Sequence, residues 1–161
     1  MSEALERRLA GAQAELDALN TVGVDLPVLA TDALVEGLDT PTLRILAGEP
    51  STMFAEFDNR DLFRKVLEEL GREPLPREEA LWQLIRFRCW DILQGHVSPI
   101  DGARRIERLV YEAPFHRVGG WFVGFSDEWG AGWGRSEGEI EAEIREVAEQ
   151  VVAAERAEDL R

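Results

Sequence analysis

The sequence predicts an all-α fold, a single-domain helical bundle of six to eight helices with an irregular Trp/Gly-rich segment. Apolar residues recur at three- and four-residue spacings along most of the 161 residues, as they do on one face of a helix. Capping side chains followed by Pro mark several helix starts. No segment alternates apolar and polar residues cleanly enough to predict a strand. The length suits one domain, and a hydrophobic content of 45% can supply a core without disulfide bonds.

The first predicted helix covers residues 3–20 and carries one narrow apolar stripe. The stripe consists of Leu5, Leu9, Ala12, Leu16 and Leu19. Because the other faces are polar or alanine, we expect residues 1–20 to be peripheral, packed at the edge of the core or against a second copy of the helix. The second arrangement would give a homodimer through residues 3–20.

Three further helices are predicted before residue 72. One covers residues 28–38, and the next begins at Asp39-Thr40-Pro41 and stops near Gly48. Asp58 is expected to cap the third of them. The apolar set of that helix is Leu62, Phe63, Val66, Leu67 and Leu70.

Residues 77–94 are predicted to form the central and most buried helix. At 100° per residue, most of its apolar side chains fall on one arc of about 120°. These residues are Leu81, Trp82, Ile85, Cys89, Ile92 and Leu93. Further aromatic residues lie outside the arc, so we expect other helices to surround this one.

Two more helices are predicted in the C-terminal half, around a segment of low regularity. Ser98-Pro99 starts a helix that runs to about residue 111, and Ser136 forms a capping box for the last helix. Residues 115–135 are the least regular part, and Trp121-Phe122-Val123 fits either a strand or a helix. Residues 153–161 are expected to fray, because the apolar pattern ends there.

The chain is strongly acidic, and its excess of negative charge is concentrated at its two ends. With 32 Asp/Glu against 18 Lys/Arg, the net charge is −14 and the pI is about 4.6. Residues 60–117 are close to neutral, with 11 Arg/Lys against 10 Asp/Glu. Such a field repels nucleic acid and anionic membranes and attracts basic partners. We therefore expect a basic protein partner, no nucleic acid and no membrane.

Composition also bears on cofactors and location. Cys89 is the sole cysteine, which excludes an intramolecular disulfide and a Cys-based metal cluster. The sequence has neither the apolar region of a signal peptide nor an apolar stretch of transmembrane length. Of the 18 basic residues 17 are Arg, which is typical of GC-rich genomes. We expect a cytoplasmic bacterial protein with no cofactor and no metal.

No motif of a known enzyme mechanism is present. The Gly-x-Ser-x-Gly elbow, the His-Glu-x-x-His zinc motif, the Cys-x-x-Cys pair and the P-loop are all absent. Cys89 lies on the buried arc and is expected to be a core residue. The glycines of residues 130–134 lack the spacing of a dinucleotide-binding loop. We therefore assign no catalytic residue, and a non-catalytic protein is favoured while the question of enzyme activity stays open.

Two features are candidates for a partner-binding site. One is an aromatic group in a loop-like segment, which could be a recognition surface or a flap whose rings pack into the core. The other is the acidic outer side of the last helix, which could contact a basic partner. The residues are Trp121, Phe125, Trp129 and Trp133 in the first group, and Glu139, Glu143 and Glu146 in the second.

Two pairs of arginines stand out in the neutral middle of the chain. Arg60 with Arg64, and Arg104 with Arg108, are each four residues apart and therefore share a helix face. We expect them to form internal ion pairs with the acidic terminal helices. A site for an acidic ligand is the alternative.

Three segments resemble those of a scattered group of small acidic helical proteins from high-GC bacteria, to which no activity is assigned. The segments are residues 37–48, 98–106 and 124–129. The likeness spans residues 30–150, and it consists of helix caps and core positions. It implies a helical fold and no activity.

Three functions fit these observations. The first is a non-catalytic acidic protein-binding module, immunity- or inhibitor-like, that engages a basic protein. The second is a small-molecule-binding protein or enzyme with a pocket between the 77–94 helix and the 115–135 segment. The third is a structural or regulatory homodimer built on the first helix.

Overall fold

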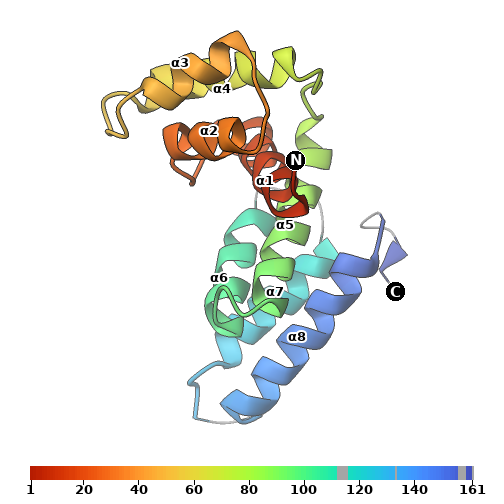
Figure 1. The fold of residues 1–161 in the computed structure, drawn as a ribbon. Coiled ribbons are helices and arrows are strands. Elements are labelled where there is room, and N and C mark those ends of the chain that lie inside the picture. The colour runs from red at the N-terminus through yellow and green to blue at the C-terminus, as the bar shows by residue number, and fades with distance from the viewer. Residues whose placement is uncertain (112–115, 133, 156–158, 161) are drawn as a thin grey trace. The chain divides into compact units, whose positions relative to one another are not determined.

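The computed structural model describes residues 1–111, 116–132, 134–155 and 159–160, and this part of the chain is all-helical. It contains eight α-helices and no strand, which confirms the predicted all-α class (Figure 1). None of these described helices is both long enough and apolar enough to cross a bilayer.

The chain divides into two compact units, Met1–Ala80 and Leu81–Arg161. The boundary falls within the first turn of α5 (Arg77–Leu93). Each unit is described by itself. The assignment of residues 1–161 to one domain stays a prediction.

The first unit contains α1 (Glu3–Leu19), α2 (Leu26–Val35), α3 (Pro41–Gly48) and α4 (Glu56–Glu69). Helix α2 packs against the other three, and α3 also packs against α4 (Figure 1). The core between them is formed by Leu5, Leu9, Ala12, Leu16, Leu26, Leu29, Ala30, Ala33, Leu43, Leu46, Phe63, Val66 and Leu67.

This core includes most of the apolar stripe that the sequence places on α1. Leu5, Leu9 and Ala12 are at most 2% exposed, and Leu16 is 3% exposed. The stripe is therefore covered by other helices of the same chain. A homodimer through residues 3–20 would need a different face of α1.

The helix starts of the first unit are partly as predicted. Thr40 caps α3, accepting a hydrogen bond from the Leu43 amide at 3.3 Å, with Pro41 as the first helical residue. Helix α2 begins at Leu26, two residues before its predicted start, because Asp25 is its cap. The prediction that Asp58 caps α4 is wrong, since that helix begins at Glu56.

The second unit contains α5, α6 (Pro99–Val110), α7 (His116–Glu128) and α8 (Glu137–Ala153). Helix α6 packs against α7 and α8, and α7 packs against α8 (Figure 1). Helices α5 and α6 approach closely at Gly102, where an added Cβ would lie 2.3 Å from Cγ1 of Ile92.

Helix α5 is deeply buried, as predicted. Its apolar arc residues Leu81, Ile85, Cys89 and Ile92 are at most 2% exposed, and Trp82 is 6% exposed. The Trp82 indole donates a hydrogen bond to the Glu155 carbonyl at 3.1 Å. This bond gives the tryptophan N–H the partner that burial requires.

Two expectations for the second unit change. The predicted irregular segment is a regular helix, α7, up to Glu128, because Val118, Phe122 and Phe125 form a buried i, i+4, i+7 face. The predicted fraying of residues 153–161 does not hold for Ala154 and Leu160, which are both buried.

Candidate functional site

The aromatic residues of the predicted partner site are split between the core and its edge. Phe125 is 3% exposed, and its ring meets Phe122 edge to face with the centroids 6.0 Å apart. Trp121 and Trp129 are half-buried, one turn to either side of Phe125. Trp133 lies outside the described residues. Phe125 therefore belongs to the core and offers almost no surface to a partner.

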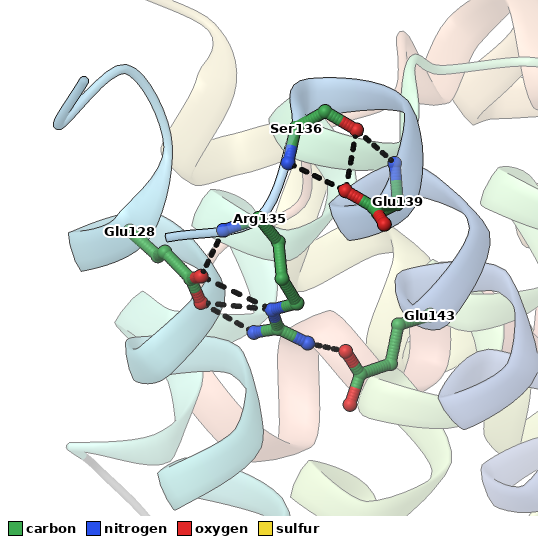
Figure 2. Close-up of polar contacts among 5 residues, drawn as sticks. All are labelled: Glu128, Arg135, Ser136, Glu139 and Glu143. Atoms are coloured by element: carbon green, nitrogen blue, oxygen red, sulfur yellow. Dashed lines mark hydrogen bonds and ion pairs between the residues drawn. The ribbon is translucent and has the colours of Figure 1, made fainter. Parts of the chain in front are cut away.

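The acidic half of the predicted site centres on Arg135, in the turn between α7 and α8. Figure 2 shows its guanidinium between two carboxylates, Glu128 at the end of α7 and Glu143 on α8. The Arg135 backbone amide also donates to Oε1 of Glu128 at 2.9 Å. The guanidinium carbon lies 5.9 Å from the centroid of the Phe125 ring. Arg135 thus connects the two helices and the core at one point.

The next residue, Ser136, starts α8 through a complete capping box, as the sequence predicts. Its hydroxyl accepts from the Glu139 amide at 3.3 Å, and Oε2 of Glu139 accepts from the Ser136 amide at 2.8 Å (Figure 2). The capping box therefore satisfies two of the backbone donors at this helix start. Glu139 serves the fold at this position.

These contacts stabilise the charged form of two carboxylates. Hydrogen bonds from the Arg135 side chain lower the pKa of Glu128 from 4.5 to about 2. Hydrogen bonds from Ser136 lower the pKa of Glu139 as well. Of the three predicted partner-binding acids, Glu139 and Glu143 have partners within the chain. Glu146 is exposed and forms no hydrogen bond or ion pair with a described residue. The α7–α8 turn is thus mainly a structural clasp.

The predicted ion pairs of Arg60 and Arg64 with the acidic terminal helices are not formed; among the described residues Arg64 pairs instead with Asp61 of its own helix, at 2.7 Å. Both guanidinium groups donate to Asn20, Arg60 to its backbone carbonyl and Arg64 to its side-chain oxygen. Asn20 ends α1 in the left-handed conformation, with φ of 53°. Cations are favourable at a helix C-terminus, where unpaired carbonyls concentrate negative charge. Arg104 and Arg108 form no ion pair with a described residue.

A surface that the sequence did not predict lies between α3 and α4. Met53, Phe54 and Phe57 are 78%, 91% and 72% exposed. We call these three residues the 53–57 surface. Large apolar side chains that gather on a surface typically mark an interaction site.

The loop that carries this surface is attached at its start, through Pro50 and Ser51. The Ser51 hydroxyl donates to Oδ1 of Asp25 at 2.8 Å, and this carboxylate also caps α2. On the other side, the Asn59 amide of α4 donates to the Pro50 carbonyl at 3.2 Å. The two bonds hold residues 50–51 against the start of α2 and against α4, so Met53 and Phe54 follow directly after an anchored turn.

A groove of about 270 Å³ lies beside the 53–57 surface. Its walls are the α1–α2 linker, the α3–α4 loop and the first turn of α4. The lining residues are Val22, Gly23, Val24, Asp25, Leu26, Pro27, Ser51, Thr52, Met53, Glu56, Asn59 and Arg60. Asn59 is 4% exposed, and its Oδ1 accepts no hydrogen bond from a described residue.

The chain matches no protein-family model, no curated protein and no solved structure. Its resemblance to helical proteins of high-GC bacteria therefore stays a prediction, and the site is interpreted from its own geometry.

The second predicted function placed a pocket between α5 and the Trp-rich segment. The sequence offers His116, Tyr111, Glu112 and Asp127 as its polar candidates. Tyr111 and Asp127 are exposed, and Glu112 lies outside the described residues. Burial raises the pKa of the Cys89 thiol, which keeps it protonated and unreactive. No group of three metal-ligating side chains occurs among the described residues. The groove of the first unit is therefore the better candidate site.

A sequence signal for this surface exists, although it is weak. At 100° per residue, Phe57 lies about 120° away from Phe63 around α4. It cannot share the core-facing side with Phe63, Val66 and Leu67. Met53 and Phe54 precede the helix and follow Pro50, so they belong to no apolar stripe.

Proposed function

We propose that the protein is a non-catalytic acidic binding protein that engages a basic protein partner through the 53–57 surface. Immunity proteins and inhibitors are examples of proteins with such a function. The observation that carries it is the exposure of Met53, Phe54 and Phe57 beside carboxylates that pair with no described cation. Those carboxylates belong to Asp25, Glu56 and Asp58.

The charge around this surface is strongly negative. Residues 21–59 contain seven Asp/Glu and one Arg. That single Arg, Arg44, pairs with Asp39: its Nε donates a hydrogen bond to Oδ1 of Asp39 at 2.6 Å. An apolar centre within an acidic border is complementary to a basic surface with an exposed apolar residue.

The apolar residues are expected to supply affinity, and the acids to supply steering and selectivity. A few desolvated aromatic anchors usually dominate the binding energy of an interface, and their truncation costs about 2 kcal/mol or more. Charges at the rim mainly raise the association rate and exclude acidic partners. The half-buried Trp121 and Trp129, and the exposed Glu146, stay predicted partner-binding residues.

Photo-crosslinking in living cells tests this proposal. A photoreactive phenylalanine analogue replaces Phe54 in the full chain, and the crosslinked protein is identified by mass spectrometry. The matched control places the analogue at Tyr111, an aromatic residue of the second unit that is 75% exposed. We expect position 54, and not position 111, to capture one protein of high pI.

The captured protein is then purified and its binding measured by calorimetry. Phe54→Ala and Phe57→Ala should each weaken the complex by about 2 kcal/mol or more, which is roughly 30-fold in Kd. Unchanged affinity in both variants would overturn the proposal, as would equal capture from position 111.

A further inference from the structure

The groove beside the 53–57 surface has the size of one side chain. Pockets for drug-sized ligands typically enclose about 300–1,000 Å³. The groove, at about 270 Å³, lies below that range and opens next to the exposed Met53. It therefore suits a single long side chain that projects from a partner docked on the 53–57 surface.

Asn59, one of the residues that line the groove, has a buried acceptor that lacks a donor. The side chain of Asn59 is fixed through its Nδ2 group, which donates to the Pro50 carbonyl. Its Oδ1 accepts nothing from the described residues, although Asn59 is only 4% exposed. Buried polar atoms without a partner are rare in native proteins, and each calls for an explanation. This oxygen is covered, so a donor in the groove would satisfy it only when the atoms over it move aside.

Three charged groups line the groove, and acceptors are in surplus. Asp25 uses Oδ1 for the Val28 amide and the Ser51 hydroxyl, and no described donor meets its Oδ2. Glu56 forms no hydrogen bond or ion pair with a described residue. Arg60 is the one cation, and it is already engaged, since it donates to the Asn20 carbonyl at the C-terminus of α1. The groove therefore offers vacant carboxylate oxygens to an incoming donor, and the covered amide oxygen of Asn59 belongs to one of its lining residues.

We propose that this groove binds an arginine side chain of the basic partner. The inference rests on the proposed function and names the group that the site recognises. A guanidinium carries five N–H donors in a planar fork, which suits several acceptors that lie around one space.

The test uses a small probe, N-acetyl-arginine N-methylamide, titrated into the ¹⁵N-labelled full chain and followed by NMR. The matched control ligand is N-acetyl-citrulline N-methylamide, which has the same shape and no charge. We expect the arginine probe to bind with a Kd of about 1 mM. Its shifts should concentrate at the Asn59 side-chain amide and at the backbone amides of Gly23 and Ser51. The citrulline probe should bind at least fivefold more weakly.

Variants of the groove provide a second measurement. Asp25→Asn removes the charge but keeps a side-chain oxygen that can cap α2, and Glu56→Gln removes the other charge. Each should weaken binding of the arginine probe about threefold or more. Glu68→Gln is the control, because Glu68 is exposed on the last turn of α4 and does not line the groove. It makes the same change in net charge and should leave the probe's affinity unchanged.

The outcomes separate this inference from the proposed function. Absence of saturable shifts with the arginine probe overturns the arginine site, and so does equal binding of citrulline. Equal weakening by Glu68→Gln also overturns it, because the effect would then follow net charge alone. Each of these results leaves capture through position 54 intact. Specific binding of the probe supports the arginine site even if position 54 captures no partner.

Discussion

Arg135 illustrates how one side chain decides whether nearby acids face a partner or serve the fold. Sequence spacing places Glu139 and Glu143 on the outer side of α8, where a basic protein could reach them. Arg135 pairs with Glu143 and Glu128, and the adjacent Ser136 takes Glu139 into a capping box (Figure 2). An apparent docking face is thus largely occupied by contacts within the chain.

The Arg135 clasp predicts a specific dependence of stability on pH. Glu128 has a folded-state pKa of about 2, below its ordinary value of 4.5, so its contribution is fully present above pH 4.5. That contribution should be lost progressively as the pH falls from 4.5 toward 2. The difference in unfolding free energy between the wild type and Glu128→Gln should therefore be largest at neutral pH and shrink over this range.

Urea unfolding of both proteins at several pH values measures this difference. Glu146→Gln is the matched control, because Glu146 is an exposed acid of α8 that forms no hydrogen bond or ion pair with a described residue. Its difference from the wild type should change little with pH. A Glu128→Gln difference that stays constant down to about pH 3 would contradict the clasp.

A second prediction at the residue scale concerns packing around α5. Ile85 is fully buried, so Ile85→Ala should lower the unfolding free energy by about 2–5 kcal/mol through lost burial and the cavity left behind. Ile45→Ala is the control, because Ile45 is 54% exposed. That change should cost less than about 0.5 kcal/mol. Similar losses in the two variants, measured by chemical denaturation, would contradict the central burial of α5.

Helices were predictable where their signals are local. The cap at Thr40 and the capping box at Ser136 lie within four residues of the groups that they bind. Helix α7 was missed because its glycines lower the intrinsic helix propensity. Burial of Val118, Phe122 and Phe125 outweighs that propensity, and such tertiary packing is not visible in a local window.

The candidate site was harder to predict because distant segments build it. The groove forms where the linker at Gly23 meets the loop at Ser51 and the start of α4 at Glu56. The spacing of these residues in the sequence does not predict that they come together in space. The Arg135–Glu143 pair spans eight residues, and for the same reason the acids of α8 looked free in the sequence.

At the scale of elements, the close approach of α5 and α6 predicts opposite effects for one substitution at two helical glycines. In α6, Gly102→Ala gains about 1 kcal/mol of helix propensity but overpacks against Ile92, at a cost of about 1–3 kcal/mol. In α7, Gly120→Ala meets nothing within 4 Å and should stabilise by about 0.5–1 kcal/mol. The urea unfolding midpoints of the two variants show whether each substitution stabilises or destabilises the protein. Stabilisation by Gly102→Ala would contradict the close contact.

For the whole molecule, the net charge of −14 has a kinetic consequence. A negative field attracts a basic partner from a distance and orients it, which raises the association rate without adding contacts. The field is uneven, however. Residues 21–59 carry six excess negative charges, from seven Asp/Glu and one Arg, and they also hold the exposed apolar residues. For the proposed basic partner, we therefore expect approach and docking at the same part of the first unit.

This arrangement predicts separate kinetic roles for charge and apolar area in binding of the captured partner. Asp58→Asn, beside Phe57, should lower the association rate constant at low salt and leave the dissociation rate nearly unchanged, because rim charges steer the encounter. The effect should vanish near 1 M salt, where the Debye length is about 3 Å. Phe54→Ala should instead raise the dissociation rate at any salt concentration, since it removes a desolvated anchor. Stopped-flow kinetics separate the two rate constants.

Glu146→Gln is the control, because it makes the same change in net charge within the second unit. It should lower the association rate constant less than Asp58→Asn does. An equal effect would show that total charge, rather than the field at the 53–57 surface, guides the partner.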